Sequence, residues 1–175
     1  PDPYKLICAD RVSLEWGLRV LECVDMLIFR MNFVGAVEFL IAQRRDDGSW
    51  EYPKGGLENH ETPLEGALRE IEEEVTIAEH DLTLCGDLGW QMVDVKYRPG
   101  KFYDTLRVNG LTFRYSGDRA RLDLSKVNEL KAYRWLPYDQ ALAKIKLPYA
   151  AEFFHRWKQR SRSILARARS ASQVD

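Results

Sequence analysis

A glycine-rich loop followed directly by an acidic helical pattern constrains the fold of this chain more than any other feature. Residues 55–77 read GGLENHETPLEGALREIEEEVTI. Thr62, Pro63 and Glu65 match the start of a helix, with threonine as N-cap, proline at the first helical position and glutamate three residues after the cap. The sequence therefore predicts a helix over residues 63–75, next to a loop whose backbone can approach a ligand closely.

The predicted helix carries its acidic and its apolar residues on different sides. At about 100° per residue, Glu70, Glu73 and Glu74 stand at i, i+3 and i+4 and are neighbours. The apolar stripe consists of Leu64, Leu68, Ile71 and Val75. Like charges at this spacing repel, and a bound cation would reverse that effect; Mg²⁺ commonly takes one or two carboxylates together with substrate phosphates. Most Glu-rich helices are simply solvated, so the preceding glycine loop is what favours a metal site, while Glu72 points elsewhere.

The same segment resembles the Nudix box, G-x5-E-x7-R-E-U-x-E-E-x-G-U, in which U is a bulky aliphatic residue. The matching residues are Gly55, Glu61, Arg69, Glu70, Ile71, Glu73, Glu74 and Ile77. Thr76 stands where the family has glycine. A left-handed residue after a helix is easy for glycine and costly for a β-branched residue, so we expect the helix exit to differ here.

The resemblance implies a fold and a reaction. The fold class is α+β, a Nudix α/β/α sandwich with a mixed sheet, and the protein is expected to be a Nudix hydrolase. Mg²⁺, with Mn²⁺ as a substitute, would be held by Glu70, Glu73 and Glu74, and would polarise phosphoryl oxygen and activate water. Glu70, Glu73 and Arg69 are the predicted catalytic residues, with Arg69 bracing the box through a salt bridge to Glu61. Which carboxylate takes the proton from water stays open.

The residues around the box resemble two Nudix subgroups. Asymmetric dinucleoside tetraphosphate hydrolases carry a P-K-G loop, and bacterial RNA 5′-pyrophosphohydrolases carry a W-x-F-P-x-G-G-I loop; residues 50–57 share features of both. The predicted substrate-binding residues are Arg44, Trp50, Lys54 and Gly55. Glu129 opens an E-x5-W segment like that of the same subgroups, which makes it a predicted further metal ligand or base. A surface glutamate before a strand is the alternative.

The rest of the chain is consistent with one domain over residues 1–175. Apolar and β-branched runs predict strands, and proline-started helical patterns predict helices. Expected strands cover residues 22–29, 37–44, 82–97, 102–115 and 132–136, and expected helices cover 137–146 and 149–169. Asn109-Gly110 is a hairpin-turn signal that would interrupt the strand 102–115. Stacking partners for a nucleotide base would come from Trp50, Tyr103, Tyr149 and Phe153, each of which could instead be core or rim.

The predicted C-terminal helix is basic and amphipathic, although the formal net charge of the whole chain is only −1. Residues 153–174 contain no acid; their basic residues are Arg156, Lys158, Arg160, Arg162, Arg167 and Arg169. Such a surface suits an RNA or an acidic protein partner. A solvated helix face explains the same residues, and on the sequence alone it is the simpler interpretation.

Three functional hypotheses arise from these patterns. The first two are metal-dependent hydrolases, acting on dinucleoside polyphosphates or on the 5′-triphosphate end of RNA. The third is a Nudix-fold RNA-binding or scaffold subunit of a ribonucleoprotein complex with weak catalysis. The intact Glu70, Glu73 and Glu74 favour an enzyme, because a scaffold has no need of an unpaired carboxylate cluster.

Cysteine usage and hydropathy bear on the compartment. Cys8, Cys23 and Cys85 lack C-x-x-C spacing and are expected to be reduced and mostly buried, which is typical of intracellular proteins. No run is long and apolar enough to span a membrane. We expect a cytoplasmic protein, or one of an organelle matrix if a targeting peptide has been removed ahead of Pro1.

Overall fold

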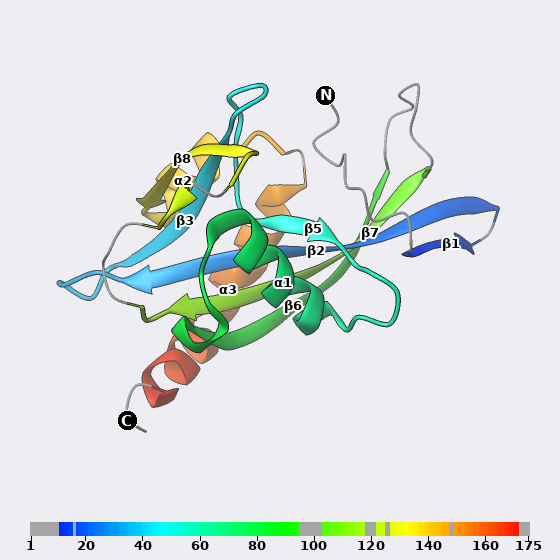
Figure 1. Ribbon diagram of the computed structural model, residues 1–175. Helices are drawn as coiled ribbons and strands as arrows, with labels where there is room; N and C mark the ends of the chain where they lie inside the picture. The colour runs from blue at the N-terminus through cyan, green and yellow to red at the C-terminus, as the bar shows by residue number, and fades with distance from the viewer. Residues whose placement is uncertain are drawn as a thin grey trace.

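The computed structural model describes residues 11–15, 17–94, 103–117, 122–124, 127–147 and 149–171. In this part of the chain a mixed sheet lies between helices, with α1 (Pro63–Val75) against one face and α3 (Ala150–Ser170) against the other (Figure 1). A shorter helix, α2 (Tyr138–Lys144), packs beside β3, and η2 (Glu79–Asp81) is a single 3₁₀ turn. This layering is the predicted α+β arrangement of an α/β/α sandwich.

The sheet is built around one long central strand. The strands are β1 (Val12–Glu15), β2 (Leu18–Met31), β3 (Val37–Arg44), β4 (Trp50–Glu51), β5 (Lys54–Gly56), β6 (Leu82–Asp94), β7 (Thr105–Tyr115) and β8 (Leu130–Leu136). Their order is β4-β3-β2-β7-β6, with β1 and β5 also paired to β2 and β8 paired to β3. β2 and β7 run parallel, and the other pairs are antiparallel. β2 is buried on both faces, which explains its nearly continuous apolar run.

Each face of the sheet has its own apolar core. On the α1 side, Ala67, Ile71 and Val75 pack against Val24 and Met26 of β2. On the α3 side the core is aromatic, and its large members include Phe29, Phe39, Tyr52, Phe153, Phe154 and Trp157. Trp157 lies edge-on to Phe39, with ring centroids 4.8 Å apart. Aromatic contacts of this kind anchor the first half of α3, and Ile164 and Ala168 bury the second half.

The start of α1 has the predicted capping box. The backbone N–H of Glu65 donates to Thr62 Oγ1 at 3.3 Å, and the Thr62 N–H donates to Glu65 Oε2 at 2.8 Å. We expected the helix exit to differ from the family pattern, and this expectation was wrong. Thr76 itself adopts the left-handed conformation, with φ 58° and ψ 27°. Its Oγ1 donates to the carbonyl of Asp123 at 3.1 Å, which offsets part of the cost of this conformation for a β-branched residue.

Two local expectations were wrong for reasons of packing. Asn109 and Gly110 do not form a hairpin turn but lie inside the continuous strand β7. Gly110 is needed because a Cβ there would lie 2.4 Å from the ring of Phe153 on α3. On α1, Leu64 is 38% exposed, whereas Glu70 is buried, so the helix buries a carboxylate in addition to its apolar stripe.

Other boundaries differ by a few residues. α2 ends at Lys144 because Ile145 leaves the helix to bridge to Trp50. Residues 95–102, at the ends of two predicted strands, lie outside the described residues, as does Cys8. Cys23 and Cys85 are free, buried thiols, as predicted. None of the described helices is long and apolar enough to cross a membrane.

Candidate active site

The glycine loop lies close beneath the carboxylates of α1. β5 pairs with β2, with Gly55 opposite Val24, and this pairing fixes the loop under the helix. A Cβ on Gly55 would lie 1.8 Å from Cδ of Glu70, so only glycine fits at this position. The loop is therefore shaped around the Glu70 side chain, which explains in physical terms why the two residues occur together.

Arg69 connects the loop, the upstream acid and the helix. Its Nε and Nη2 donate to the two carboxylate oxygens of Glu61 at 2.7 and 2.9 Å, which is the predicted salt bridge. The same guanidinium donates to Glu70 Oε1 at 2.8 Å and to the carbonyl of Gly56 at 2.9 Å. Hydrogen bonding to Arg69 lowers the pKa of Glu61. A planar guanidinium can hold all three acceptors at once, and lysine could not.

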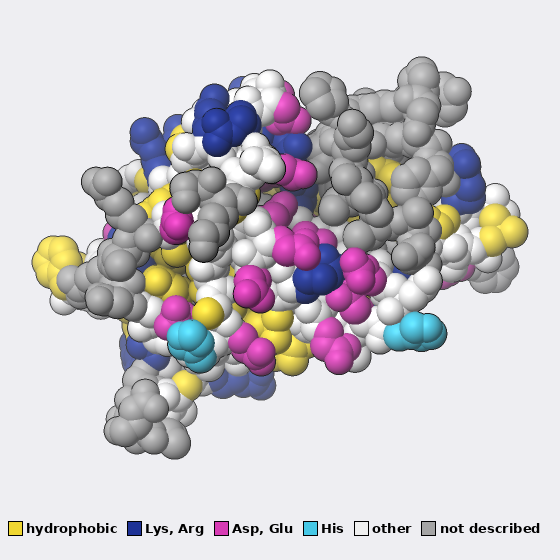
Figure 2. Space-filling model, viewed as in Figure 1, with side chains coloured by type: hydrophobic (Ala, Val, Ile, Leu, Met, Phe, Trp, Pro, Cys, Tyr) yellow, Lys and Arg dark blue, Asp and Glu magenta, His cyan; other side chains and the backbone are white. Residues whose placement is uncertain are grey.

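Burial perturbs the carboxylates of the box. Burial raises the pKa of Glu70 to about 7, with Glu73 adding to the rise and Arg69 opposing it. Burial also raises the pKa of Glu74 to about 8, with Glu70 adding to the rise. Glu74 Oε2 accepts a hydrogen bond from the N–H of Lys54 at 3.0 Å, whereas the Glu73 side chain is 62% exposed. Acidic side chains gather over α1 and the loop before it (Figure 2).

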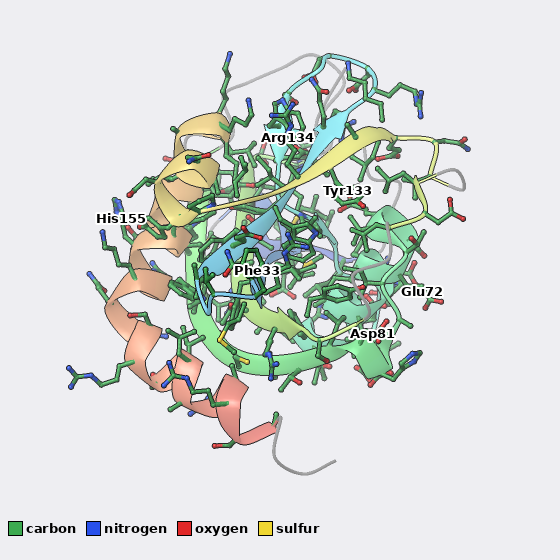
Figure 3. All side chains as sticks on the ribbon, turned by 90° about the vertical axis from the view of Figure 1, so that its left-hand side faces the viewer. Phe33, Glu72, Asp81, Tyr133, Arg134 and His155 are labelled. Carbon is green, nitrogen blue, oxygen red and sulfur yellow. The ribbon has the colours of Figure 1, made fainter. Side chains whose placement is uncertain are left out.

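The carboxylates of α1 are the type of ligand that a hard divalent cation prefers. Glu70, Glu73 and Glu74 could supply oxygen ligands, and a cation bound between them would favour the ionised forms of Glu70 and Glu74, which burial disfavours. Among the described residues no three His, Cys, Asp or Glu side chains are already gathered around one point as metal ligands. Glu73 is exposed and can change rotamer, so binding would complete the set. Glu72 points away from the body of the protein, as expected for a solvated residue (Figure 3).

The predicted phosphate-binding cations, Lys54 and Arg44, are both engaged by Glu51. Lys54 Nζ lies 2.6 Å from Glu51 Oε2 and is buried. Arg44 Nη1 lies 3.2 Å from Glu51 Oε1, and its Nη2 lies 3.0 Å from Asp46. These pairs hold both cations inside the protein beneath the loop, and their role as phosphate ligands stays a prediction.

Glu129 lies at the start of β8, beside this network. Its side chain is 58% exposed, and Oε2 is 3.9 Å from Nη1 of Arg44. Through Arg44, Glu51 and Lys54 it is linked by successive contacts to the Glu74 end of the box. This position is compatible with both interpretations of Glu129, a further metal ligand or base and a surface glutamate.

The predicted aromatic residues divide into two groups. Phe153 and Tyr103 are buried in the core and cannot stack on a substrate in this structure, and Tyr149 is partly buried against the same core. Trp50 is partly exposed, and two cations lie over its ring: Arg134 Cζ is 5.4 Å and Lys144 Nζ is 5.2 Å from the ring centroid. Trp50 therefore holds positive charge next to the loop, a cation–π role that the sequence did not reveal.

The sequence analysis did not identify a buried polar pair below the loop, Tyr52 and Asp25. The Tyr52 hydroxyl donates to Asp25 Oδ2 at 2.7 Å, and burial raises the pKa of Asp25 to about 7. Lys54 is opposite Asp25 in the β2–β5 pairing. The signal was present in the sequence, because an aspartate interrupts the apolar run of β2.

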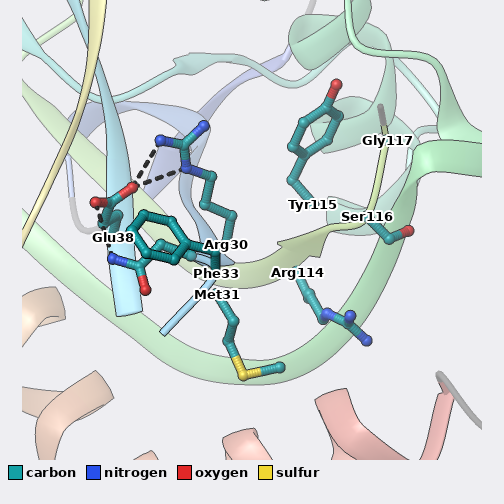
Figure 4. A pocket seen from close by; sticks show the side chains of 9 residues that line it. Arg30, Met31, Phe33, Glu38, Arg114, Tyr115, Ser116 and Gly117 are labelled. Carbon is teal, nitrogen blue, oxygen red and sulfur yellow. Dashed lines mark hydrogen bonds and ion pairs between the residues drawn. The ribbon is translucent and has the colours of Figure 1, made fainter. Parts of the chain in front are cut away.

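A separate hollow opens at the far end of β2. It has a volume of about 280 Å³ and lies between the β2–β3 turn and the end of β7, with Arg30, Phe33 and Tyr115 in its lining (Figure 4). Arg30 is paired there with Glu38 at 2.7 Å. At about 3.3 Å per residue, Arg30 lies roughly 20 Å along the strand from Val24, which pairs with the glycine loop. The hollow is thus distinct from the carboxylate site.

Comparison with known proteins identifies the family. A family model described as NUDIX domain matches residues 22–157. The chain belongs to the NUDIX family. The chain is a Nudix hydrolase with its box on the β5 loop and α1, and members of the family generally use divalent metals.

Individual relatives agree with this assignment. An RNA pyrophosphohydrolase of Helicobacter pylori (strain P12) is 33% identical over 138 residues, which are 75% of this chain and 86% of that protein. An RNA pyrophosphohydrolase of Stutzerimonas stutzeri is 31% identical over 126 residues, covering 67% of this chain and 78% of that protein. Among solved structures, a C. elegans Ap4A hydrolase complex has a TM-score of 0.63 at 20% identity, covering 79% of this chain and 96% of that one. At that identity the structural likeness shows the Nudix fold alone.

Proposed function

We propose that this Nudix hydrolase is an RNA 5′-pyrophosphohydrolase. Water would attack the α-phosphorus at the 5′-triphosphate end of an RNA, and the bond from that phosphorus to the oxygen bridging the α- and β-phosphates would break. The products would be pyrophosphate and an RNA with a 5′-monophosphate. The observation that carries the proposal is the likeness to RNA pyrophosphohydrolases over most of the chain. The intact carboxylate set of α1 supports a catalytic role over that of a scaffold.

The metal would be Mg²⁺, with Mn²⁺ as a substitute. Glu70, Glu73 and Glu74 would hold it, with Glu129 as a further ligand. When bound, the metal neutralises phosphate charge and lowers the pKa of water. Every one of these ligands is a carboxylate, and hard cations prefer oxygen ligands of this kind.

The remaining residues of the site have positioning roles. Arg69 donates hydrogen bonds to Glu70, Glu61 and the carbonyl of Gly56, and so fixes the loop to the helix. Gly55 lets the loop backbone lie directly against the Glu70 carboxylate and so keeps that side chain in place. Glu70, Glu73, Glu74 or Glu129 accepts the proton from the attacking water, and the pH profiles of their glutamine variants would distinguish them.

Dinucleoside polyphosphates are the second candidate substrate class. The Pro53-Lys54-Gly55 sequence favours them, because it resembles the loop of dinucleoside tetraphosphate hydrolases. Both substrates present a phosphoanhydride chain to the same carboxylates. They differ at the ends of the phosphate chain: the dinucleotide has a nucleoside at each end, whereas the RNA has a free γ-phosphate at one end and a polynucleotide at the other.

The test is a side-by-side assay of 5′-triphosphorylated RNA and diadenosine tetraphosphate with Mg²⁺ or Mn²⁺. We expect pyrophosphate release from the RNA with the larger kcat/KM. A larger kcat/KM for the dinucleotide would instead select the second candidate. An enzyme that is inert on both substrates with both metals would refute both hydrolase assignments and would favour the binding-subunit alternative.

A further inference from the structure

The basic residues of α3 form two sets on opposite sides of the helix. At about 100° per residue, Lys158, Arg162 and Arg169 fall within roughly 40° of one another. We call these three the outer basic face. The second set lies about 120–200° away around the helix and consists of Arg156, Arg160 and Arg167. The two sets have the same charge but different surroundings.

The arginines of the second set donate hydrogen bonds to backbone carbonyls of β6, at the edge of the sheet. Arg156 donates to the carbonyls of Leu88 and Trp90 at 3.1 and 3.2 Å. Arg160 donates to the carbonyl of Asp87 at 2.7 Å. Arg167 donates to the carbonyl of Cys85 at 3.5 Å. β6 is the edge strand, and its register shifts within this stretch, so the guanidinium groups satisfy carbonyls that strand pairing leaves open.

The outer basic face has no such partner. Lys158, Arg162 and Arg169 are exposed, and among the described residues none of them forms an ion pair. Lys158 Nζ lies 4.9 Å from the ring centroid of Tyr138 on α2. The face spans 11 residue steps, or about 16 Å at 1.5 Å per residue. Three unpaired cations in a line create a site for a linear polyanion, and not for a single small anion.

This face is continuous with the cations beside the glycine loop. Trp50 bridges to Ile145 at the end of α2 and lies under Lys144. Tyr138, at the start of α2, contacts Phe154 of α3 with ring centroids 5.5 Å apart. α2 therefore connects the loop before the box to the outer basic face. Figure 3 shows Arg134 on β8 and His155 on α3 on the side of the molecule where α2 lies.

Charge along this route is strongly one-sided. Residues 138–171 contain eight Lys and Arg, of which five lie outside the set that donates to β6, and only two acids, Asp139 and Glu152. Glu152 is paired with Arg156 at 2.7 Å, on the side away from the outer basic face. Cations interleaved with aromatic rings are the arrangement that single-stranded nucleic acid tracks, because phosphates and bases alternate along it.

We propose that the RNA body behind the 5′-triphosphate runs from Trp50 across α2 onto the outer basic face of α3. The inference rests on the proposed function for the position of the 5′ end, but the face itself is tested by binding. It makes the C-terminal helix an RNA-binding element that adds affinity for long substrates and leaves the chemistry at the box unchanged.

The test compares two triple variants. Lys158→Gln/Arg162→Gln/Arg169→Gln removes the charges, and Lys158→Arg/Arg162→Lys/Arg169→Lys keeps them. Binding to an RNA of about 20 nucleotides is followed by fluorescence anisotropy across a salt series. Because single-stranded contacts contribute about 0.7 each to the log–log salt slope, the neutral variant should lose about 2 from the slope and at least about 10-fold in affinity near 150 mM salt. The charge-conserving variant should match the wild type.

Activity separates this inference from the proposed function. On the long triphosphorylated RNA the neutral variant should lose kcat/KM about as it loses affinity, whereas on a triphosphorylated dinucleotide it should equal the wild type. An unchanged salt slope would overturn the inference. An equal loss of kcat/KM on both lengths would also overturn it, because the defect would then lie at the box. If the wild type cleaves neither RNA but the slope still falls, the face binds RNA and only the proposed function fails.

Discussion

The two long helices, α1 and α3, lie on opposite faces of the sheet and differ in the sign of their charge and in how much of it is buried. α1 is acidic and buries part of its charge, because Glu70 lies under Gly55 and is held by Arg69. α3 buries aromatic rings, turns one set of arginines onto the backbone of β6 and leaves another set in solvent. Charge that is fixed by short contacts suits chemistry, which requires defined geometry. Charge on long exposed side chains suits affinity for an extended partner.

The largest effect should come from the buried carboxylate of α1. Glu70→Gln keeps the shape of the side chain but removes its charge and its strong pairing with Arg69. We expect kcat to fall at least about 100-fold, the scale of a lost acid–base group or metal ligand. Glu72→Gln is the matched control, two residues further along the helix on an exposed side chain, and it should retain wild-type activity. Equal activities of the two variants in a pyrophosphate-release assay would remove Glu70 from the site.

The two close-packed glycines should separate activity from stability. Gly55→Ala would press on the Glu70 carboxylate, whereas Gly110→Ala would press on the ring of Phe153. We expect each change to cost about 1–3 kcal/mol of unfolding free energy. Only Gly55→Ala should also lower kcat per folded molecule, measured after urea titration has established the folded fraction. A similar loss of kcat in Gly110→Ala would mean that α3 takes part in the chemistry.

Bound metal should oppose the pH dependence of the protein's stability. In the metal-free protein, burial raises the pKa of Glu70 to about 7 and that of Glu74 to about 8, from an ordinary 4.5. The folded state therefore binds more protons than the unfolded state between these values, and its unfolding free energy falls as pH rises through this range. Metal binding needs the ionised carboxylates, so its stabilising effect grows over the same range.

Thermal unfolding with and without Mn²⁺ measures this effect of the metal. The increase in Tm caused by Mn²⁺ should be larger at about pH 8.5 than at about pH 6. The Glu70→Gln/Glu74→Gln variant is the control and should show little increase at either pH. An increase in Tm that is the same at both values would contradict the assignment of these two residues as ligands.

The smallest effect is expected at the end of α1. Thr76→Gly removes the cost of a left-handed β-branched residue but also removes the hydrogen bond to the Asp123 carbonyl. We expect a gain of no more than about 1 kcal/mol in unfolding free energy, with unchanged kcat. Chemical denaturation measures the first quantity. A marked rise in kcat would show instead that Thr76 strains the catalytic end of the helix.

The predictability of the two helices from the sequence follows the same division. Spacing placed α1 and its capping box, and the family resemblance implied the Glu61–Arg69 pair; all three depend on contacts between residues close in sequence. The burial of Glu70 depends on β5 pairing with β2, and spacing cannot express a long-range pairing of that kind. Gly110 was misread because its reason is a ring on α3, more than forty residues later.

The charges of α3 could be counted but not assigned from the sequence. A helical projection separates its two basic sets, but only the position of β6 shows that one set is occupied. Likewise, Lys54 and Arg44 were predicted as phosphate ligands from their place beside the loop, and their pairing with Glu51 depends on the packing of β3, β4 and β5. Substrate choice belongs to such long-range arrangements, and the reaction class belongs to the box.

Mn²⁺ binding to the free protein at about pH 8.5 tests most directly whether Glu70 and Glu74 of α1 form the metal site, and it is followed by electron paramagnetic resonance of the unbound ion. We predict that wild type and Glu72→Gln bind Mn²⁺ alike. Glu70→Gln and Glu74→Gln should each weaken binding at least about 10-fold, the loss expected when a ligand or its support is removed. Equal binding by all four proteins would contradict the assignment of the metal site to these carboxylates.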